Sequence, residues 1–268
     1  MSDIEDTIDN AEEAETRAPE FSDEALALRF IKRHENDLRY VAAWNKWFLW
    51  DGCRWAADET KRAFDLARAI CREASAECKK DTTARQVASA KTVAAVVILA
   101  RADRKIAASV DVWDADPWLL NTPESVIDLR TGSQRPNAPD LHMTKVTSTK
   151  PQGECACWLE FLERITSGDR QLQDYIKRLA GYSLTGLTRE HVLAFLYGTG
   201  ANGKSVLLNS MSGLMGDYAM SAPMETFVAS RNEHHPTELA MLRGARLVTA
   251  TETEEGRRWA ESKIKALT

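Results

Sequence analysis

The sequence predicts an α/β core in the second half of the chain, preceded by a mostly α-helical region with a small β-hairpin. Three adjacent segments predict the core. Residues 191–197 form an apolar run of strand length, which is typical of a parallel strand buried on both faces. Residues 198–205 follow with the pattern G-x-x-x-x-G-K-S, and residues 204–215 then place apolar side chains along one helical stripe that ends at Gly216. A strand, a glycine-rich loop and a helix in this order predict the core of a P-loop NTPase.

The glycine-rich loop is the candidate phosphate-binding site. It consists of Gly198, Thr199, Gly200, Ala201, Asn202, Gly203, Lys204 and Ser205. The glycines let the backbone turn tightly, and the amides of the loop and of the first helical turn are expected to point toward phosphate oxygens. Lys204 is placed to reach the β- and γ-phosphates of ATP, and the Ser205 hydroxyl is placed to bind Mg²⁺. The alternative is an ordinary turn, but a turn does not need Lys-Ser after its last glycine.

Composition and charge narrow the class of protein. The chain has 268 residues, of which 44% are hydrophobic, as in ordinary globular proteins. Residues 1–24 hold ten acidic residues and one basic residue, so we expect 1–21 to be a disordered acidic tail before a mildly basic body. The N-terminus lacks the apolar core of a signal peptide, and the longest apolar run, residues 93–100, is too short to span a bilayer. Five scattered cysteines favour free thiols and a reducing compartment. Taken together, these features predict a cytoplasmic protein with no membrane partner.

Residues 22–150 are predicted to form an N-terminal α+β domain. Ser22 is placed to cap a helix over 23–34, and Asp51-Gly52 between aromatic flanks predicts a hairpin. Trp44 to Trp55 contains four tryptophans, which either stack on nucleic-acid bases or form the hydrophobic face of a small sheet. The absence of alternating Lys or Arg favours the sheet.

Further elements of this domain follow from local patterns. Thr60 is expected to cap a helix to residue 79, with Phe64 on its inner face, and a longer helix is expected over 83–107. Residues 126–129 predict a short strand, and 130–132 predict the turn after it.

Residues 151–190 are expected to be a helical linker subdomain before the partial core at 191–268. Apolar residues repeat at helical spacing from Trp158 and again from Leu172, with a break at Gly168-Asp169.

A second apolar strand is expected over 245–251, and it ends at an acidic turn. Phosphoryl-transfer sites of this class need an acid at the end of a second strand, where it holds Mg²⁺ through water or orients the attacking water. Glu252 is the first choice for this catalytic and metal-binding role, and Glu254 is the second. A solvated acidic turn before a helix remains the alternative. A further short strand is expected over 218–222, and a short helix over 236–242.

Four stretches resemble the phage and plasmid primase–helicases, which carry a superfamily 3 helicase domain. These stretches are residues 118–123, 126–132, 193–205 and 236–255. The resemblance implies an AAA+-like ATPase that uses ATP and Mg²⁺, assembles as a homo-oligomeric ring and translocates on single-stranded DNA in a bacterial host. It makes 198–205 the first helicase motif, assigns Glu252 to the second, and makes 263–268 the opening of the third.

Two departures from the family pattern accompany the resemblance. No segment has the length of a primase domain, and the chain ends at Thr268, before the family's sensor strand and arginine finger. We therefore expect a core that is incomplete at its C-terminus. The alternative functions are a non-catalytic nucleotide-binding remnant and a small P-loop kinase, although a kinase needs an arginine-rich lid and residues 218–242 hold only Arg231.

Overall fold

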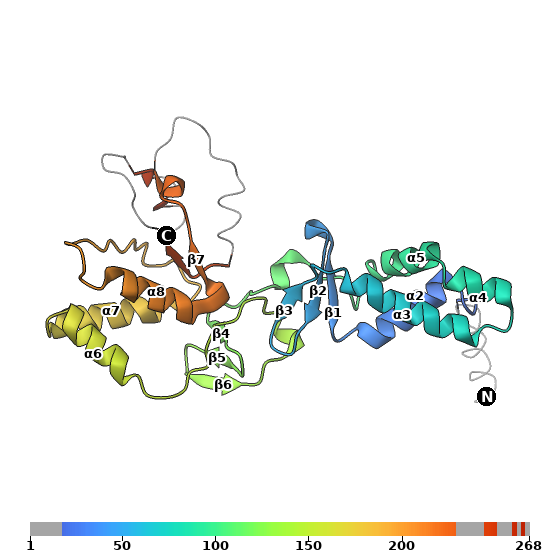
Figure 1. The fold of residues 1–268 in the computed structure, drawn as a ribbon, viewed down its shortest axis with the longest axis horizontal. Helices are drawn as coiled ribbons and strands as arrows, with labels where there is room; N and C mark the ends of the chain where they lie inside the picture. The colour runs from blue at the N-terminus through green and yellow to red at the C-terminus, as the bar shows by residue number, and fades with distance from the viewer. Residues whose placement is uncertain (1–17, 229–243, 251–258, 262–263, 266–268) are drawn as a thin grey trace, which may run out of the picture. The chain divides into compact units, whose positions relative to one another are not determined.

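The computed structural model describes residues 18–228, 244–250, 259–261 and 264–265 (Figure 1). By its contacts the chain divides into two compact units. The first contains residues up to 51 together with 55–112, and the second contains 52–54 together with 113–268. The contact division falls near residue 112 rather than 150, and the four segments expected from the sequence stay a prediction.

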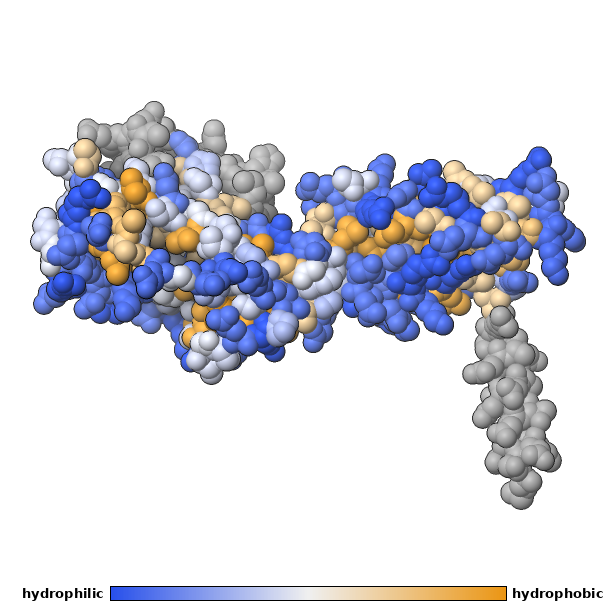
Figure 2. Space-filling view, turned by 60° about the horizontal axis from the view of Figure 1, so that its bottom comes forward, coloured by the Kyte–Doolittle hydropathy of each residue, from blue (hydrophilic) through white to orange (hydrophobic). Residues whose placement is uncertain are grey.

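The first unit buries an apolar core between helices. Its helices are α2 (Asp23–His34), α3 (Arg62–Glu77), α4 (Asp81–Val87) and α5 (Ala90–Ala100), with a 3₁₀ turn, η2, at Val110–Val112. The predicted start of α2 is confirmed, because the Ser22 hydroxyl accepts a hydrogen bond from the Ala25 amide at 3.2 Å. Phe30, Ile70 and Val96, from three different helices, are fully buried in this core. Figure 2 shows hydrophilic side chains over most of the visible face of this unit, with narrower hydrophobic bands between them.

The structure corrects the predicted start and the predicted inner face of α3. Thr60 does not cap α3, because the Asp58 carboxylate accepts from the Arg62 amide at 2.8 Å and from the Ala63 amide at 2.9 Å. Phe64 is correspondingly exposed rather than on the inner face.

The single long helix expected over 83–107 is also wrong. It is broken into α4 and α5, because the Ser89 hydroxyl accepts from the Thr92 amide at 3.2 Å and starts a new helix there. The two helices are bent by 53° at this break. Among the described residues no single helix is long and apolar enough to cross a membrane, and this bent pair meets that test only by length and composition.

A three-stranded antiparallel sheet completes the first unit. Strand β2 (Lys46–Trp50) lies between β1 (Leu38–Val41) and β3 (Trp55–Ala57), with the 3₁₀ turn η1 (Ala42–Trp44) joining β1 to β2. The hairpin predicted at Asp51-Gly52 is confirmed, because β2 and β3 pair antiparallel on either side of it. Trp47 and Trp55 are buried, which supports the hydrophobic-face interpretation of the tryptophan cluster over base stacking. The Arg39 guanidinium lies 5.0 Å from the centre of the Trp55 ring.

The second unit begins with a small antiparallel sheet. Its strands, in spatial order, are β4 (Leu119–Asn121), β5 (Val126–Asp128) and β6 (Ser133–Arg135), and the 3₁₀ turn η3 (Pro139–Leu141) follows. The strand and turn predicted around 126–132 are confirmed, since the Gly132 amide donates to the Asp128 carbonyl at 2.7 Å.

Two amphipathic helices follow the sheet. They are α6 (Ala156–Ile165) and α7 (Arg170–Ser183). The predicted break between them is confirmed, because the Asp169 carboxylate accepts from the Gln171 amide at 2.9 Å and from the Leu172 amide at 3.1 Å and so starts α7.

The last part of the second unit contains helix α8 (Lys204–Met215) and a parallel pair of short strands. Strand β7 (Ala219–Ser221) pairs with β8 (Leu247–Thr249), and the 3₁₀ turns η4 (Gly216–Tyr218) and η5 (Met224–Phe227) flank β7. The helix predicted over 204–215 is confirmed at both ends, and both short strands lie within the predicted ranges.

The buried strand expected over 191–197 is not formed. These residues are described, but they make no ladder with any described strand, and Phe195 and Tyr197 are 59% and 83% exposed. Strand β8 instead pairs with β7, so the described residues leave the 191–197 backbone without a partner strand. The complete P-loop core stays a prediction.

Candidate phosphate-binding site

The glycine-rich loop turns into α8 through backbone conformations that few residues adopt. Gly198, Ala201 and Gly203 have φ angles of 138°, 58° and 87°, and Gly203 directly precedes the helix. Left-handed residues among right-handed ones turn successive amides toward one side, as in the anion-binding nests of phosphate loops. The loop therefore has positive φ angles at three of its eight residues, two of which are glycines.

Two glycines of the loop also lie close to neighbouring side chains. A Cβ at Gly203 would lie 2.5 Å from Ile165 Cγ2 and 3.3 Å from Phe161 Cε2, both on α6. A Cβ at Gly198 would lie 2.6 Å from the Asn202 side-chain nitrogen. Glycine thus lets the start of α8 approach α6, and it also lets the loop close over its own Asn202.

Lys204 folds its ammonium group back over the loop. Its Nζ donates to the carbonyls of Gly198 and Thr199 at 3.0 and 3.3 Å and to Asn202 Oδ1 at 2.8 Å. These acceptors are neutral, and phosphate oxygens carry negative charge, so an entering triphosphate offers Lys204 stronger charge-assisted hydrogen bonds. Ser205 is exposed in the first turn of α8, where a hydroxyl is accessible to Mg²⁺.

The predicted acids are not placed by the structure. Glu252 and Glu254 lie outside the described residues, as does most of the 263–268 segment. Among the residues that are described, no group of three or more His, Cys, Asp or Glu is arranged to hold a metal ion. Ser205 is consequently the one predicted magnesium ligand whose position can be described.

The C-terminal end of α8 is fixed by the segment 145–148. Gly216 has φ 55° and ψ −123°, and a Cβ there would lie 2.6 Å from the Val146 carbonyl oxygen. The Asp217 amide donates to that carbonyl at 3.0 Å, and the Val146 amide donates to Asp217 Oδ2 at 3.1 Å. The Ser148 amide donates to the Leu214 carbonyl at 3.2 Å, which gives a partner to one of the free carbonyls that end any helix.

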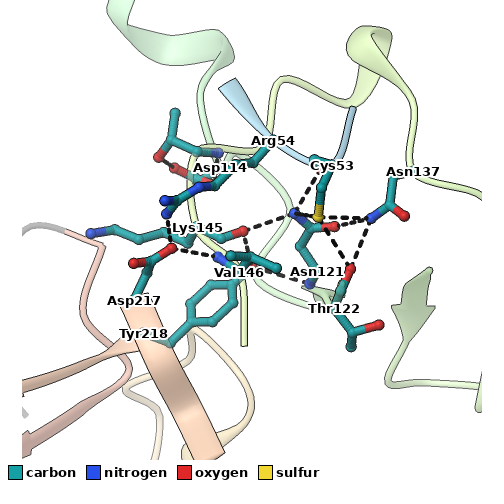
Figure 3. A network of polar contacts seen from close by, with 11 residues as sticks. Cys53, Arg54, Asp114, Asn121, Thr122, Asn137, Lys145, Val146, Asp217 and Tyr218 are labelled. Atoms are coloured by element: carbon teal, nitrogen blue, oxygen red, sulfur yellow. Dashed lines mark hydrogen bonds and ion pairs between the residues drawn. The ribbon is translucent and has the colours of Figure 1, made fainter. Parts of the chain in front are cut away.

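A buried polar network adjoins this contact (Figure 3). Asn121 is fully buried, and its side-chain amide donates to the carbonyls of Cys53 at 3.1 Å and Lys145 at 2.9 Å. Its side-chain oxygen accepts from the side-chain amide of Asn137 at 2.7 Å, and its backbone amide donates to the Tyr218 hydroxyl at 3.1 Å. Sequence reasoning missed this network; the only local signal was a polar Asn121 directly after two leucines in a strand.

Arg246 joins strand β8 to the same region. Its guanidinium lies 4.4 Å from the centre of the Tyr218 ring and donates to the Leu184 and Leu119 carbonyls at 2.6 and 2.7 Å. Burial lowers the pKa of Arg246 and raises the pKa of Tyr218 to about 12. The Tyr218 hydroxyl thus stays a neutral donor and acceptor in the network.

A known family model matches the first part of the chain. Residues 27–167, just over half of the sequence, match a family model described as D5 N terminal like. No curated protein matches the chain. The matched range contains Asn121 and the segment 145–148, and it ends before the glycine-rich loop begins.

Proposed function

The chain belongs to the family described as D5 N terminal like, the N-terminal domain of phage and plasmid primase–helicases of this type, and on this basis we propose that it is an ATP-binding and ATP-hydrolysing DNA helicase module. The observation that carries the proposal is the loop 198–205, which presents Lys204 at the start of α8. The family supplies the setting in DNA replication, and the loop supplies the chemistry of triphosphate binding.

The loop residues would each contribute to holding the triphosphate. The amides at the start of α8 and the positive end of its dipole attract phosphate oxygens. The Lys204 ammonium moves from the loop carbonyls to the β- and γ-phosphates and stabilises the charge that develops during hydrolysis. Ser205 would hold Mg²⁺, which supplies further positive charge against the phosphates, and Glu252 would orient the attacking water.

The proposed partner is single-stranded DNA, and the proposed assembly is a homo-oligomeric ring in the cytoplasm of a bacterial host. A ring places the loop of one copy beside its neighbour, which can supply the arginine that neutralises the transition-state charge. The proposed core is an AAA+-like α/β fold.

A nucleotide-binding module without hydrolysis is the second candidate. It is favoured by the largely exposed segment 191–197, because a loop that follows a segment with no partner strand among the described residues is held less rigidly than in a complete core. Binding needs only the loop and Mg²⁺, whereas hydrolysis also needs a positioned water and a precisely placed acid.

The test compares the wild-type protein with Lys204→Ala in ATP binding and in ATP hydrolysis with and without single-stranded DNA. We expect DNA-stimulated hydrolysis in the wild type and loss of both binding and hydrolysis in the variant. Lys177→Ala on α7 is the matched control, since Lys177 is an exposed lysine of the same unit, and it should behave as the wild type. ATP binding without turnover selects the second candidate, whereas absence of binding or phosphate transfer to a small acceptor contradicts both.

A further inference from the structure

We propose that Asp217 is a positioning residue for the nucleotide site. It holds the site in place by tying the C-terminal end of α8, which we call its base, to Arg54 and Val146 of the D5 N terminal like segment. This inference rests on the proposed binding of nucleotide at 198–205. It adds that the affinity of the loop depends on residues of the family-matched segment that never touch the nucleotide.

Helix α8 transmits the position of its base to the loop. A helix of this length extends about 18 Å, and at such a length a tilt of roughly 10° at one end displaces the other by about 3 Å, which is the length of a hydrogen bond. Displacements of about 1 Å are already costly in sites that position charged groups. The orientation of the base therefore decides whether Lys204 and the loop amides meet the phosphates correctly.

The base of α8 is fixed by directional contacts. The Ser148 hydroxyl donates to the Leu214 carbonyl at 3.3 Å and also to the Gly213 carbonyl, beside the amide contact described above. The Asp217 amide donates to the Val146 carbonyl, and this approach requires glycine at position 216, because a Cβ there would collide with the same carbonyl oxygen. Hydrogen bonds specify an angle as well as a distance, so these contacts set the axis of the helix.

The Asp217 carboxylate adds a charged contact to this base. Its Oδ2 accepts from the Val146 amide and forms an ion pair with the Arg54 guanidinium (Figure 3). The side chains of Arg54 and Asp217 are 30% and 35% exposed, so the pair is partly withdrawn from water and its attraction is less screened than that of a surface pair. Arg54 and Val146 both lie in the family-matched range, whereas Asp217 lies beyond it.

The strand that leads toward Glu252 is fixed to the same place. Arg246 stands immediately before β8 and donates to the Leu119 carbonyl at the start of β4, and its amide donates to the Tyr218 carbonyl at 2.8 Å. The loop helix is therefore tied to 145–148 and this strand to β4, and the Thr147 amide joins the two supports by donating to the Asn121 carbonyl at 3.0 Å. A disturbance of this common support changes the position of one relative to the other.

The experiment measures the dissociation constant of the full chain for a fluorescent ATP analogue with Mg²⁺ in Arg54→Ala, Asp217→Ala and the double variant. All measurements are made below the temperature at which any variant begins to unfold, as checked by circular dichroism. Each single variant should weaken binding roughly tenfold, and the double variant should weaken it no more than the stronger single one, because both remove the same contact. Arg54→Lys should restore part of the affinity.

Two further variants keep the result decisive. Asp217→Asn retains an acceptor for the Val146 amide, so it should fold even if Asp217→Ala does not, and it should weaken binding by a smaller factor. Arg130→Ala is the control, because Arg130 pairs with Asp116 and Asp128 on the surface of the same unit, and it should leave the affinity unchanged.

The failure of this inference differs from the failure of the proposed function. Folded Arg54→Ala and Asp217→Asn proteins that bind as tightly as the wild type contradict the positioning role alone. A wild-type protein that does not bind the analogue contradicts the proposed function and the inference with it.

Discussion

The two units differ in their interiors: the first buries a large apolar core, whereas the second combines a smaller apolar cluster around Leu120, Met215 and Tyr218 with a buried polar network. In the first unit, side chains such as Phe30 and Ile70 are fully buried among other apolar residues. In the second unit, the buried Asn121 lies in a network of carbonyls, amides and a tyrosine hydroxyl. Apolar burial stabilises without specifying a direction, whereas hydrogen bonds fix the angle at which segments meet. The polar network is thus suited to orient the helix that carries Lys204.

The largest effect on stability is expected from breaking the apolar core. Phe30→Ala removes a fully buried ring that packs against His34 and Trp47, with centroid distances of 5.0 and 6.3 Å. Such truncations cost about 3–5 kcal/mol of unfolding free energy. Denaturant unfolding followed by tryptophan fluorescence measures the loss, and Leu28→Ala, at an exposed position of α2, is the control. A loss under about 1 kcal/mol would show that this core is not the main source of stability in the unit.

Breaking the polar network is expected to cost less stability than breaking the apolar core, but it is also expected to weaken nucleotide binding. Asn121→Leu keeps the size of the side chain and removes its hydrogen bonds to the Cys53 and Lys145 carbonyls. Removing hydrogen bonds from buried groups in this way costs about 1–3 kcal/mol. Urea unfolding and ATP-analogue binding are measured on the same preparation. If affinity is unchanged in the folded variant while stability falls, the network is structural only and the contrast between the units disappears.

The smallest effect is expected at the start of α3 in the first unit, and it depends on pH. Burial alone would raise the pKa of Asp58, but hydrogen bonds from the Ala63, Arg62 and Thr60 amides outweigh it and lower the pKa. The folded protein thus favours the carboxylate, so this stabilisation is present above the ordinary aspartate pKa and is lost as pH falls through the lowered value.

Asp58→Asn should consequently cost about 1 kcal/mol near neutral pH. The difference from the wild type should shrink as the pH falls below about 4, where Asp58 of the unfolded chain becomes protonated while the folded protein still favours the carboxylate. Thermal unfolding of both proteins across this pH range measures the difference. A difference that stays constant with pH would mean that the Asp58 charge does not contribute.

Elements with strong local signals were predictable from the sequence. Ser22 and Asp169 start helices because their side chains accept from amides two or three residues away. Helix α8 was predicted at both ends because a glycine precedes it and another follows it. The break at Ser89 was missed, since the alanine-rich sequence on both sides favours helix and conceals the start of a new one.

Elements that depend on distant contacts were not predictable. Arg54 and Asp217 are 163 residues apart, and Asn121 and Cys53 are 68 apart, so no local pattern brings either pair together. The strand expected over 191–197 has the right composition but no described partner strand, and composition alone does not form a ladder. The loop at 198–205 was identified because its pattern is contiguous, while the support of α8 was not.

Hydrogen exchange of the full chain with and without Mg²⁺ and ATP tests most directly that the loop binds a triphosphate. The account predicts slower amide exchange across 198–207 and across 145–148 when nucleotide is added, with no change in α2 or α3, and loss of this protection in Lys204→Ala. Unchanged exchange at the loop, or equal protection in the wild type and in Lys204→Ala, would contradict it.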